Sequence, residues 1–356
     1  MRETETNCNF HLMNTTSLTL NFVGVGEVEF PEYSSNDYYG REVPYAIFIG
    51  VFCSLAIFLQ VLVIRVFIMD REMKKLPAFQ IMLAISIFDT IQLFIHFTAV
   101  YYILNSKPHF GIVDFTLGAI INASWVVMLL LSMLLNFNRI FSIVFHFQSN
   151  KIFTPKLMKV YFIIAILIWC LPAILNISGL SRMVYLLPAY TWHYLAEPHL
   201  SEIVRTVSAD ISLLDVVFSL VSHLIIFTWI YMKAAILSKK ELILTIQVLC
   251  ISIFHVVGYV TWEYLPIPWD LPIGVFLGHV VWMVWNSINP VLYILINPSQ
   301  RSAFEVISWN HKTELKYMLN WIEVGATEHN WTFRSLKDRR SRGTKGCSSP
   351  SENKNK

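Results

Sequence analysis

Seven long apolar stretches set the first limit on what this chain can fold into. They span residues 45–64, 78–100, 115–137, 160–180, 211–232, 242–262 and 272–296. A helix needs about 20 apolar residues to cross the hydrocarbon core of a bilayer, and each stretch meets that length. A β-barrel is disfavoured, because barrel strands are about half as long and alternate strictly between polar and apolar residues. The sequence therefore predicts an all-α membrane protein, a seven-transmembrane helix bundle.

The charged residues support this interpretation. Only 14% of the residues are charged and 55% are hydrophobic, whereas about a quarter of the residues in an average soluble protein are charged. The charges also cluster between the apolar stretches, which excludes most soluble enzymes. A net charge of +3 is too small to indicate a polyanionic partner, so the lipid bilayer is expected as a partner and nucleic acid is not.

The basic residues predict the orientation of the bundle. The loops after spans one, three and five hold eleven Lys and Arg, and the loops after spans two, four and six hold three. Cytosolic loops carry the excess of positive charge, so the amino terminus is predicted outside. Residues 1–44 then form an extracellular tail, 45–296 the bundle, 297–322 a cytosolic amphipathic juxtamembrane helix and 323–356 a disordered cytosolic tail.

Polar residues recur at helical spacing inside spans two, three, five, six and seven. Lipid cannot satisfy such groups, so they are expected to face the bundle interior and to line a hydrated cavity. Spans one and four carry few of them and are predicted to be peripheral. The alternative is that these residues only join helices by hydrogen bonds worth about 0.6 kcal/mol each. Asp89 argues against that for its own position, since a carboxylate near mid-bilayer costs about 3 kcal/mol.

Several motifs mark a resemblance to a receptor family. The last span ends in NPVLY (residues 289–293), which resembles the NPxxY signature of rhodopsin-like G-protein-coupled receptors. Asn138 and Arg139 stand where those receptors have an acid followed by arginine. The segments MKK (73–75), FQIM (79–82) and IFDTIQL (87–93) are similar to the second-span region of nematode serpentine chemoreceptors, class T.

The resemblance implies a seven-helix receptor that binds a small extracellular ligand and activates a heterotrimeric G protein. It places such a receptor in the plasma membrane, or in a sensory cilium. It also implies a set of residues for activation and G-protein coupling: Asp89, Asn138, Arg139, Glu241, Asn286, Asn289, Pro290 and Tyr293. Within this set, Asp89, Asn286 and Asn289 would form a polar network, and Tyr293 would swing inward on activation. Pro290 removes a backbone hydrogen bond and allows a kink.

The sequence departs from the receptor pattern at three places. Asn138 replaces the acid beside Arg139, so an arginine lock needs another carboxylate, for which Glu241 is the candidate. Span six has no Cys-Trp-x-Pro motif, which leaves Gly258 as a candidate pivot. Asp114 stands at the outer end of span three and residues 181–207 contain no cysteine, so the usual disulfide to the second outer loop cannot form.

The outer half of the predicted cavity is aromatic and weakly polar. Eight residues are expected to line it and to bind the ligand: His96, Tyr101, Asn122, Trp125, Asp215, Tyr259, His279 and Trp282. A small neutral or weakly acidic ligand fits this lining better than a monoamine, because span three lacks a deep counter-ion. Span seven has no lysine, which excludes a retinal Schiff base.

Other classes of function are less well supported. We expect no cofactor, no metal site and no enzymatic activity, since no HExxH motif and no nucleophile–base pair at usable spacing is present. The alternative is a multi-span transporter or ligand-gated channel with an ion or proton path through Asp89 and Asp215. Against it, no inverted repeat or ring of acids is apparent.

The orientation can be tested with glycosylation sequons. Asn14 begins an N-x-T sequon in the predicted outer tail and should carry sugar, whereas Asn330 begins one in the predicted cytosolic tail. We expect an endoglycosidase mobility shift that disappears in Asn14→Gln and persists in Asn330→Gln. A shift that disappears only in Asn330→Gln would mean that the topology is inverted.

Overall fold

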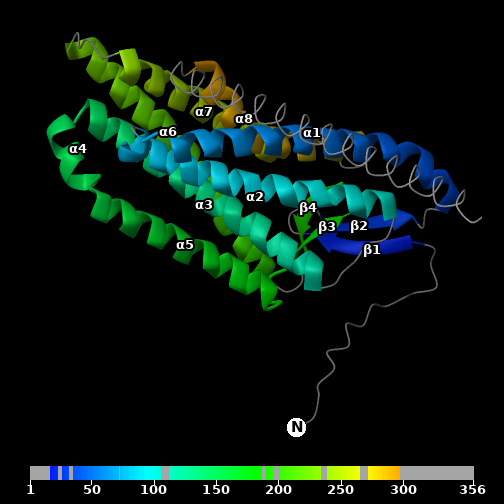
Figure 1. Cartoon of the computed structure of the whole chain (residues 1–356). Coiled ribbons are helices and arrows are strands. Elements are labelled where there is room, and N and C mark those ends of the chain that lie inside the picture. Colours follow the sequence, from blue (N-terminus) through cyan, green and yellow to red (C-terminus); the bar gives the residue numbers. More distant parts are fainter. Residues whose placement is uncertain are drawn as a thin grey trace, which may run out of the picture. The chain divides into compact units, whose positions relative to one another are not determined.

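A bundle of long helices forms the body of the protein (Figure 1). The computed structural model describes residues 17–22, 26–31, 35–71, 73–105, 112–186, 190–195, 200–233, 239–264 and 272–296. Within them, the helices long and apolar enough to cross a membrane are α1 (Ser35–Met69), α2 (Pro77–Asn105), α3 (Ile112–Ile143), α5 (Pro155–Ile177), α6 (Leu200–Lys233), α7 (Lys239–Tyr264) and α8 (Pro272–Ile296). These helices confirm the seven predicted spans. The predicted amphipathic helix, the tail at 323–356 and the sequon at Asn14 lie outside the described residues.

Shorter elements connect these helices. The 3-10 turn η1 (Met73–Lys75) precedes α2, and the two-turn helix α4 (His146–Ile152) lies between α3 and α5. Strands β1 (Ser17–Phe22) and β2 (Gly26–Pro31) pair antiparallel ahead of α1. Strands β3 (Met183–Leu186) and β4 (Thr191–Tyr194) form a second antiparallel hairpin between α5 and α6.

The start of α6 shows a limit of the hydropathy argument. The apolar stretch of the fifth span begins at Ile211, whereas α6 begins at Leu200. Charged side chains interrupt the hydropathy before Ile211, but a helix satisfies its backbone internally whether those side chains face lipid or water. At 1.5 Å per residue the 34 residues extend about 51 Å, well beyond a hydrocarbon core of about 30 Å. The first turns of α6 therefore project from the core and carry Arg205.

Helix α3 is the centre of the bundle. It packs against α2, α5 and α6, and touches α7 and β3. Within its membrane-span segment 67% of the residues are buried, against 28% in α1 and 22% in α5. The low values confirm that the first and fourth spans are peripheral. Their outward faces are aliphatic and aromatic, as contact with lipid requires.

The β3–β4 hairpin lies at one end of the bundle, where α2 ends and α3 begins (Figure 1). We call it the lid hairpin and that end of the bundle the hairpin end; the opposite end, near the end of α3, is the Arg139 end. Met183 pairs with Tyr194, and Leu186 pairs with Thr191. Trp192 has an exposed fraction of only 1%. The hairpin is therefore packed into the helices and does not lie loosely over them.

Close packing and hydrogen bonds hold the lid hairpin without a cysteine. The backbone of Met183 packs directly on Gly118 of α3. The Tyr194 hydroxyl donates to Asn122 Oδ1 at 2.5 Å, and the Arg182 amide donates to Ser201 Oγ at 2.9 Å. These contacts stabilise the loop at the place where the resemblance would put a disulfide.

A second anchor lies between α2 and the hairpin. The Tyr102 ring stacks on Tyr185 with 5.3 Å between ring centroids, and its hydroxyl donates to the Asp114 carboxylate at the start of α3. Asp114 has an exposed fraction of 2%. The residue that replaces the usual cysteine is therefore itself part of the attachment of α2 to α3.

The contact at Gly118 makes a stability prediction. A Cβ at this position would lie 1.9 Å from the Met183 carbonyl oxygen, whereas a Cβ at Gly50 in α1 would lie no closer than 3.5 Å to Val100. Both Ala substitutions improve helix propensity by about 1 kcal/mol, so their difference isolates the clash. Gly118→Ala should lower the free energy of unfolding by about 1–3 kcal/mol, which is measured as a lower unfolding temperature of the solubilised protein. Gly50→Ala should not lower it. Equal unfolding temperatures would contradict this packing.

Candidate functional site

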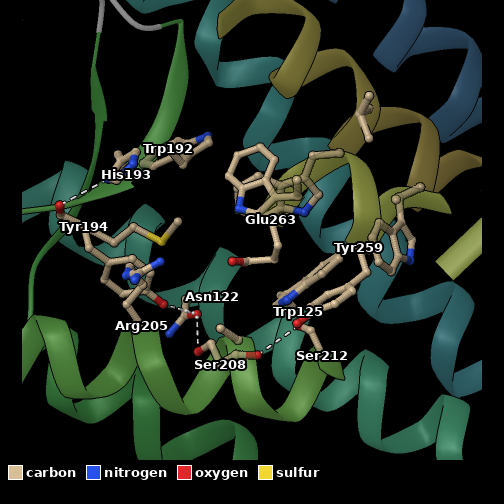
Figure 2. A pocket seen from close by; sticks show the side chains of 17 residues that line it. Asn122, Trp125, Trp192, His193, Tyr194, Arg205, Ser208, Ser212, Tyr259 and Glu263 are labelled. Atoms are coloured by element: carbon tan, nitrogen blue, oxygen red, sulfur yellow. Dashed lines mark hydrogen bonds between the residues drawn. The ribbon is translucent and has the colours of Figure 1, made fainter. Parts of the chain in front are cut away.

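A cavity lies beneath the lid hairpin (Figure 2). Its volume is about 120 Å³, and residues of α3, α6, α7, α8 and the lid hairpin line it. A cavity of about 150 Å³ in another protein holds a benzene molecule. The space is slightly smaller than that, so it suits a ligand of about one ring.

One side of the cavity is aromatic. Trp125 of α3 contacts Trp285 of α8 edge-on with ring centroids 4.6 Å apart, and Trp282 at 5.7 Å. Trp262 of α7 contacts Trp282 at 6.0 Å, and Tyr259 of α7 also lines the space. Such edge-to-face pairs each contribute about 0.5–1.5 kcal/mol beyond the area that they bury. The rings thus form a rigid wall that joins three helices.

The other side of the cavity is polar. Asn122 of α3 accepts hydrogen bonds from the Tyr194 hydroxyl and from Ser208 Oγ of α6, the latter at 3.4 Å. Arg205, one turn earlier on α6, lines the same side. His193 of the lid hairpin stands beside it, and burial lowers the pKa of His193 to about 4, with the Arg205 charge acting in the same direction. His193 is therefore neutral at pH 7.

The structure brings four of the eight expected ligand residues to this cavity: Asn122, Trp125, Tyr259 and Trp282. The other four do not line it. Tyr101 has an exposed fraction of 57%, because α2 turns that position outward, away from the bundle. His96, His279 and Asp215 are buried in contacts between helices.

His96 and His279 hold the lid hairpin to α2 and α8. His96 Nδ1 lies 3.0 Å from His279 Nε2, and His279 Nδ1 hydrogen-bonds to the Tyr190 carbonyl. A carbonyl oxygen can only accept, so His279 carries its proton on Nδ1 and accepts from His96 at Nε2. The two histidines thus connect the hairpin to α2 and α8, which is a structural role.

Asp215 and His255 form a buried pair below the cavity. Asp215 Oδ2 on α6 lies 2.7 Å from His255 Nδ1 on α7, and Ser132 Oγ on α3 lies 3.4 Å from the same nitrogen. The His255 ring is 4.9 Å from Trp285, which lines the cavity. The pair is thus in contact with the lining of the cavity through one aromatic ring.

Asp89 belongs to a different interface. Its Oδ2 accepts from Asn289 Nδ2 of α8 at 2.7 Å, and Gln60 of α1 donates to the Asn286 carbonyl at 3.0 Å. Asp89 thus joins α2 to α8, whereas Asp215 joins α6 to α7. The two carboxylates therefore belong to different helix interfaces. Tyr293, one turn beyond Asn289, is fully buried.

A second, larger cavity opens at the Arg139 end. Its volume is about 880 Å³, and α2, α3, α4, α5 and α7 contribute to it. Arg139 and Asn138 line it, with Arg139 Nη2 donating to Asn138 Oδ1 at 2.6 Å. Glu241 at the start of α7 lines the same cavity. The candidate partners of an arginine lock therefore share one space.

Comparisons with known proteins agree with this architecture. Residues 19–317 match the family described as serpentine type 7TM GPCR chemoreceptor Srt. The chain belongs to this family. Among solved structures, squid rhodopsin is similar, with a TM-score of 0.58 and 14% sequence identity over 79% of this chain and 88% of that chain. That likeness concerns the fold alone. No curated protein matches the sequence.

Membership of the Srt family confirms the resemblance carried by the motifs of spans two, three and seven. The protein is a multi-pass membrane protein of the receptor type, with a rhodopsin-like bundle. Its family and fold are those of receptors and not of enzymes.

Part of the cavity lining was not predicted from the sequence. Arg205, Glu263 and Trp285 line the cavity but were not expected to do so. Arg205 lies before the apolar stretch and Glu263 just after one, so an argument confined to the spans passes over both. The hairpin residues have no span pattern at all. The position of Trp285 could have been predicted, since it follows Trp282 by three residues and so lies on the same face of the helix.

Trp285 packs where α7 has no side chain. A Cβ at Gly258 would lie 2.2 Å from Trp285 Cε3, so this glycine makes room for the indole. Gly258 was expected as a pivot of span six, and the structure gives it a packing role against α8. That α7 also bends at Gly258 on activation stays a prediction.

This contact predicts coupled mutational effects. Gly258→Ala should destabilise the protein by about 1–3 kcal/mol, because the new methyl group overlaps a ring that three helices confine. In a Trp285→Leu background the same substitution should cost much less, since the overlapping ring is gone. Thermal unfolding of the four proteins measures this cycle. Additive effects of the two substitutions would contradict the contact.

Proposed function

We propose that this protein is a G-protein-coupled chemoreceptor that binds a small molecule in the cavity under the lid hairpin. The observation that carries the proposal is the presence of two cavities at opposite ends of one bundle, with buried polar and aromatic groups between them. The hairpin-end cavity is small and aromatic, as a ligand site is expected to be. The Arg139-end cavity is large enough to admit a helix terminus of a partner protein.

The basic loops support the orientation that this proposal needs. They place the hairpin end outside and the Arg139 end in the cytosol. A ligand then arrives from outside the cell, and a heterotrimeric G protein binds at the cytosolic cavity. The plasma membrane, or a sensory cilium, is the location that follows.

A continuous series of contacts supports communication between the ends. Trp285 touches the ligand cavity and His255. His255 and Ser132 are neighbours, and Asn136, one turn further along α3, donates to Ser219 of α6 at 2.8 Å. Arg139 follows three residues later, on the same side of α3. A ligand that moves Trp285 would therefore act on contacts among α3, α6 and α7, which form a two-state element in this proposal.

Arg139 is the proposed output of that element. It is almost fully buried, with an exposed fraction of 5%, and its guanidinium donates a hydrogen bond to the neutral Asn138. We propose that attraction to Glu241 holds α3 and α7 together in the resting state. Separation of the two helices would then free Arg139 for the G protein.

The basal activity of variants tests this proposal without a known ligand. Glu241→Gln should raise basal nucleotide exchange on a heterotrimeric G protein in membranes, because it removes the proposed attraction to Arg139. Adding Arg139→Ala to Glu241→Gln should abolish the increase. Glu202→Gln, an exposed position near the start of α6 at the hairpin end, is the matched control and should leave basal exchange unchanged.

The possible results separate the receptor from its alternative. Exchange that is the same in the wild type, Glu241→Gln and the control would contradict the proposed lock. If reconstituted protein instead carries an ionic current that Asp215→Asn abolishes, the transporter or channel interpretation replaces the receptor.

A further inference from the structure

The unpaired polar atoms around the hairpin-end cavity share one chemical character. Among the lining residues that the structure describes, the buried side-chain nitrogens or oxygens without a hydrogen-bond partner are Asn122 Nδ2, Trp192 Nε1, Arg205 Nε and Trp285 Nε1. All four are N–H donors. A buried donor without a partner costs about 1–3 kcal/mol. A ligand that supplies acceptors would recover this cost, and a ligand that supplies donors would not.

The orientation of Asn122 is fixed by its neighbours. Its Oδ1 receives the Tyr194 hydroxyl at 2.5 Å and faces Ser208 Oγ at 3.4 Å. In this orientation Oδ1 is the acceptor for the Tyr194 hydroxyl, while the Ser208 hydroxyl also donates to the Val204 carbonyl at 2.8 Å. The amino group is therefore the part of Asn122 that is left over for another partner.

Arg205 adds a positive charge to this set of donors. It makes no ion pair or hydrogen bond with any residue of the described part of the chain. Burial lowers the pKa of His193 and raises the pKa of Tyr194, and the Arg205 charge is close enough to both to act in the lowering direction on each. His193 is neutral at pH 7, so the guanidinium is the cationic group on this side of the cavity. Arginine binds carboxylates in a bidentate geometry that its planar donor array matches.

Glu263 is the acidic residue of the cavity. It reaches from the last turn of α7 toward the same space (Figure 2). More than a third of its surface is exposed, so water reaches its carboxylate, in contrast to the buried Asn122. It neither pairs with Arg205 nor supplies a donor, and its charge opposes an anionic ligand in the cavity.

We propose that the cavity binds a small aromatic carboxylate. The carboxylate group accepts hydrogen bonds from Arg205 and Asn122, and the ring lies against the aromatic side formed by Trp125, Tyr259 and Trp282. The volume of about 120 Å³ limits the ligand to about one ring and its acid group. This inference rests on the proposed function only in taking the cavity as the ligand site.

Binding to the purified, detergent-solubilised protein tests the proposal directly. The probes are benzoate, its neutral analogue benzamide and its cationic analogue benzylamine, and the readout is the saturable rise in unfolding temperature. We expect benzoate to bind, and the two analogues to bind at least about tenfold more weakly, since they lack the charge that Arg205 recognises.

Three single substitutions locate the site. Arg205→Gln should weaken benzoate binding at least about tenfold. Glu263→Gln should strengthen it, because a repelling charge is removed. Arg182→Gln is the matched control: Arg182 lies over the Phe115 ring at the same end of the bundle but does not line the cavity, so binding should be unchanged. Arg205→Lys, which keeps the charge, should retain part of the affinity and guards against a folding defect.

Several results would overturn the proposal. Equal binding of benzamide and benzoate would show that the acid group is not recognised. Benzylamine binding that Glu263→Gln abolishes would show that the cavity prefers cations, and no binding of any probe would show that this ligand class is wrong. Because the assay contains no G protein, benzoate binding in a protein that never stimulates nucleotide exchange would refute the receptor proposal and leave the ligand class standing.

Discussion

The absence of water in a bilayer core is the constraint on which the whole structure depends. Every polar side chain within the core has to find its partners inside the protein. Asn122, Ser132 and Asn136 on α3 meet this demand by contacts to α6, α7 and the lid hairpin. As a consequence α3 lies at the centre, while α1 and α5, which have few such groups, lie outside. The hydrogen bonds that these side chains make thus join α3 to its neighbours.

The same constraint explains how much of the structure could be predicted. Spans, their number and the peripheral places of α1 and α5 follow from local patterns, because lipid imposes the same rule on every residue. Asn122, Trp125, Tyr259 and Trp282 were found in the cavity because they lie on inward helix faces near its depth. His279 lies on the same face as Trp282, yet its bonds to His96 and Tyr190 depend on the hairpin, which no periodicity announces.

The positions of residues outside the core could not be predicted from the sequence, for a physical reason. Arg205 and the residues of β3 and β4 lie outside the apolar stretches, so the rule that lipid imposes on a span does not predict where they point. Only tertiary contacts place them, such as the fit of Met183 on Gly118; within the spans, the fit of Trp285 on Gly258 is a contact of the same kind. Those two glycines carry no side chain, and their meaning depends entirely on what approaches them. A cavity lined both by the apolar stretches and by residues outside them is thus half predictable.

The way the lid hairpin is attached has a consequence for the redox behaviour of the protein. Gly118, Asn122, Ser201 and Tyr102 hold it by packing and hydrogen bonds, and residues 181–207 contain no cysteine to oxidise. Its closure over the cavity therefore does not depend on an oxidising compartment or on a disulfide isomerase. Thiol reagents have no covalent bond to cleave at this loop. The roof of the cavity can form as soon as the helices meet, at whatever potential the surroundings have.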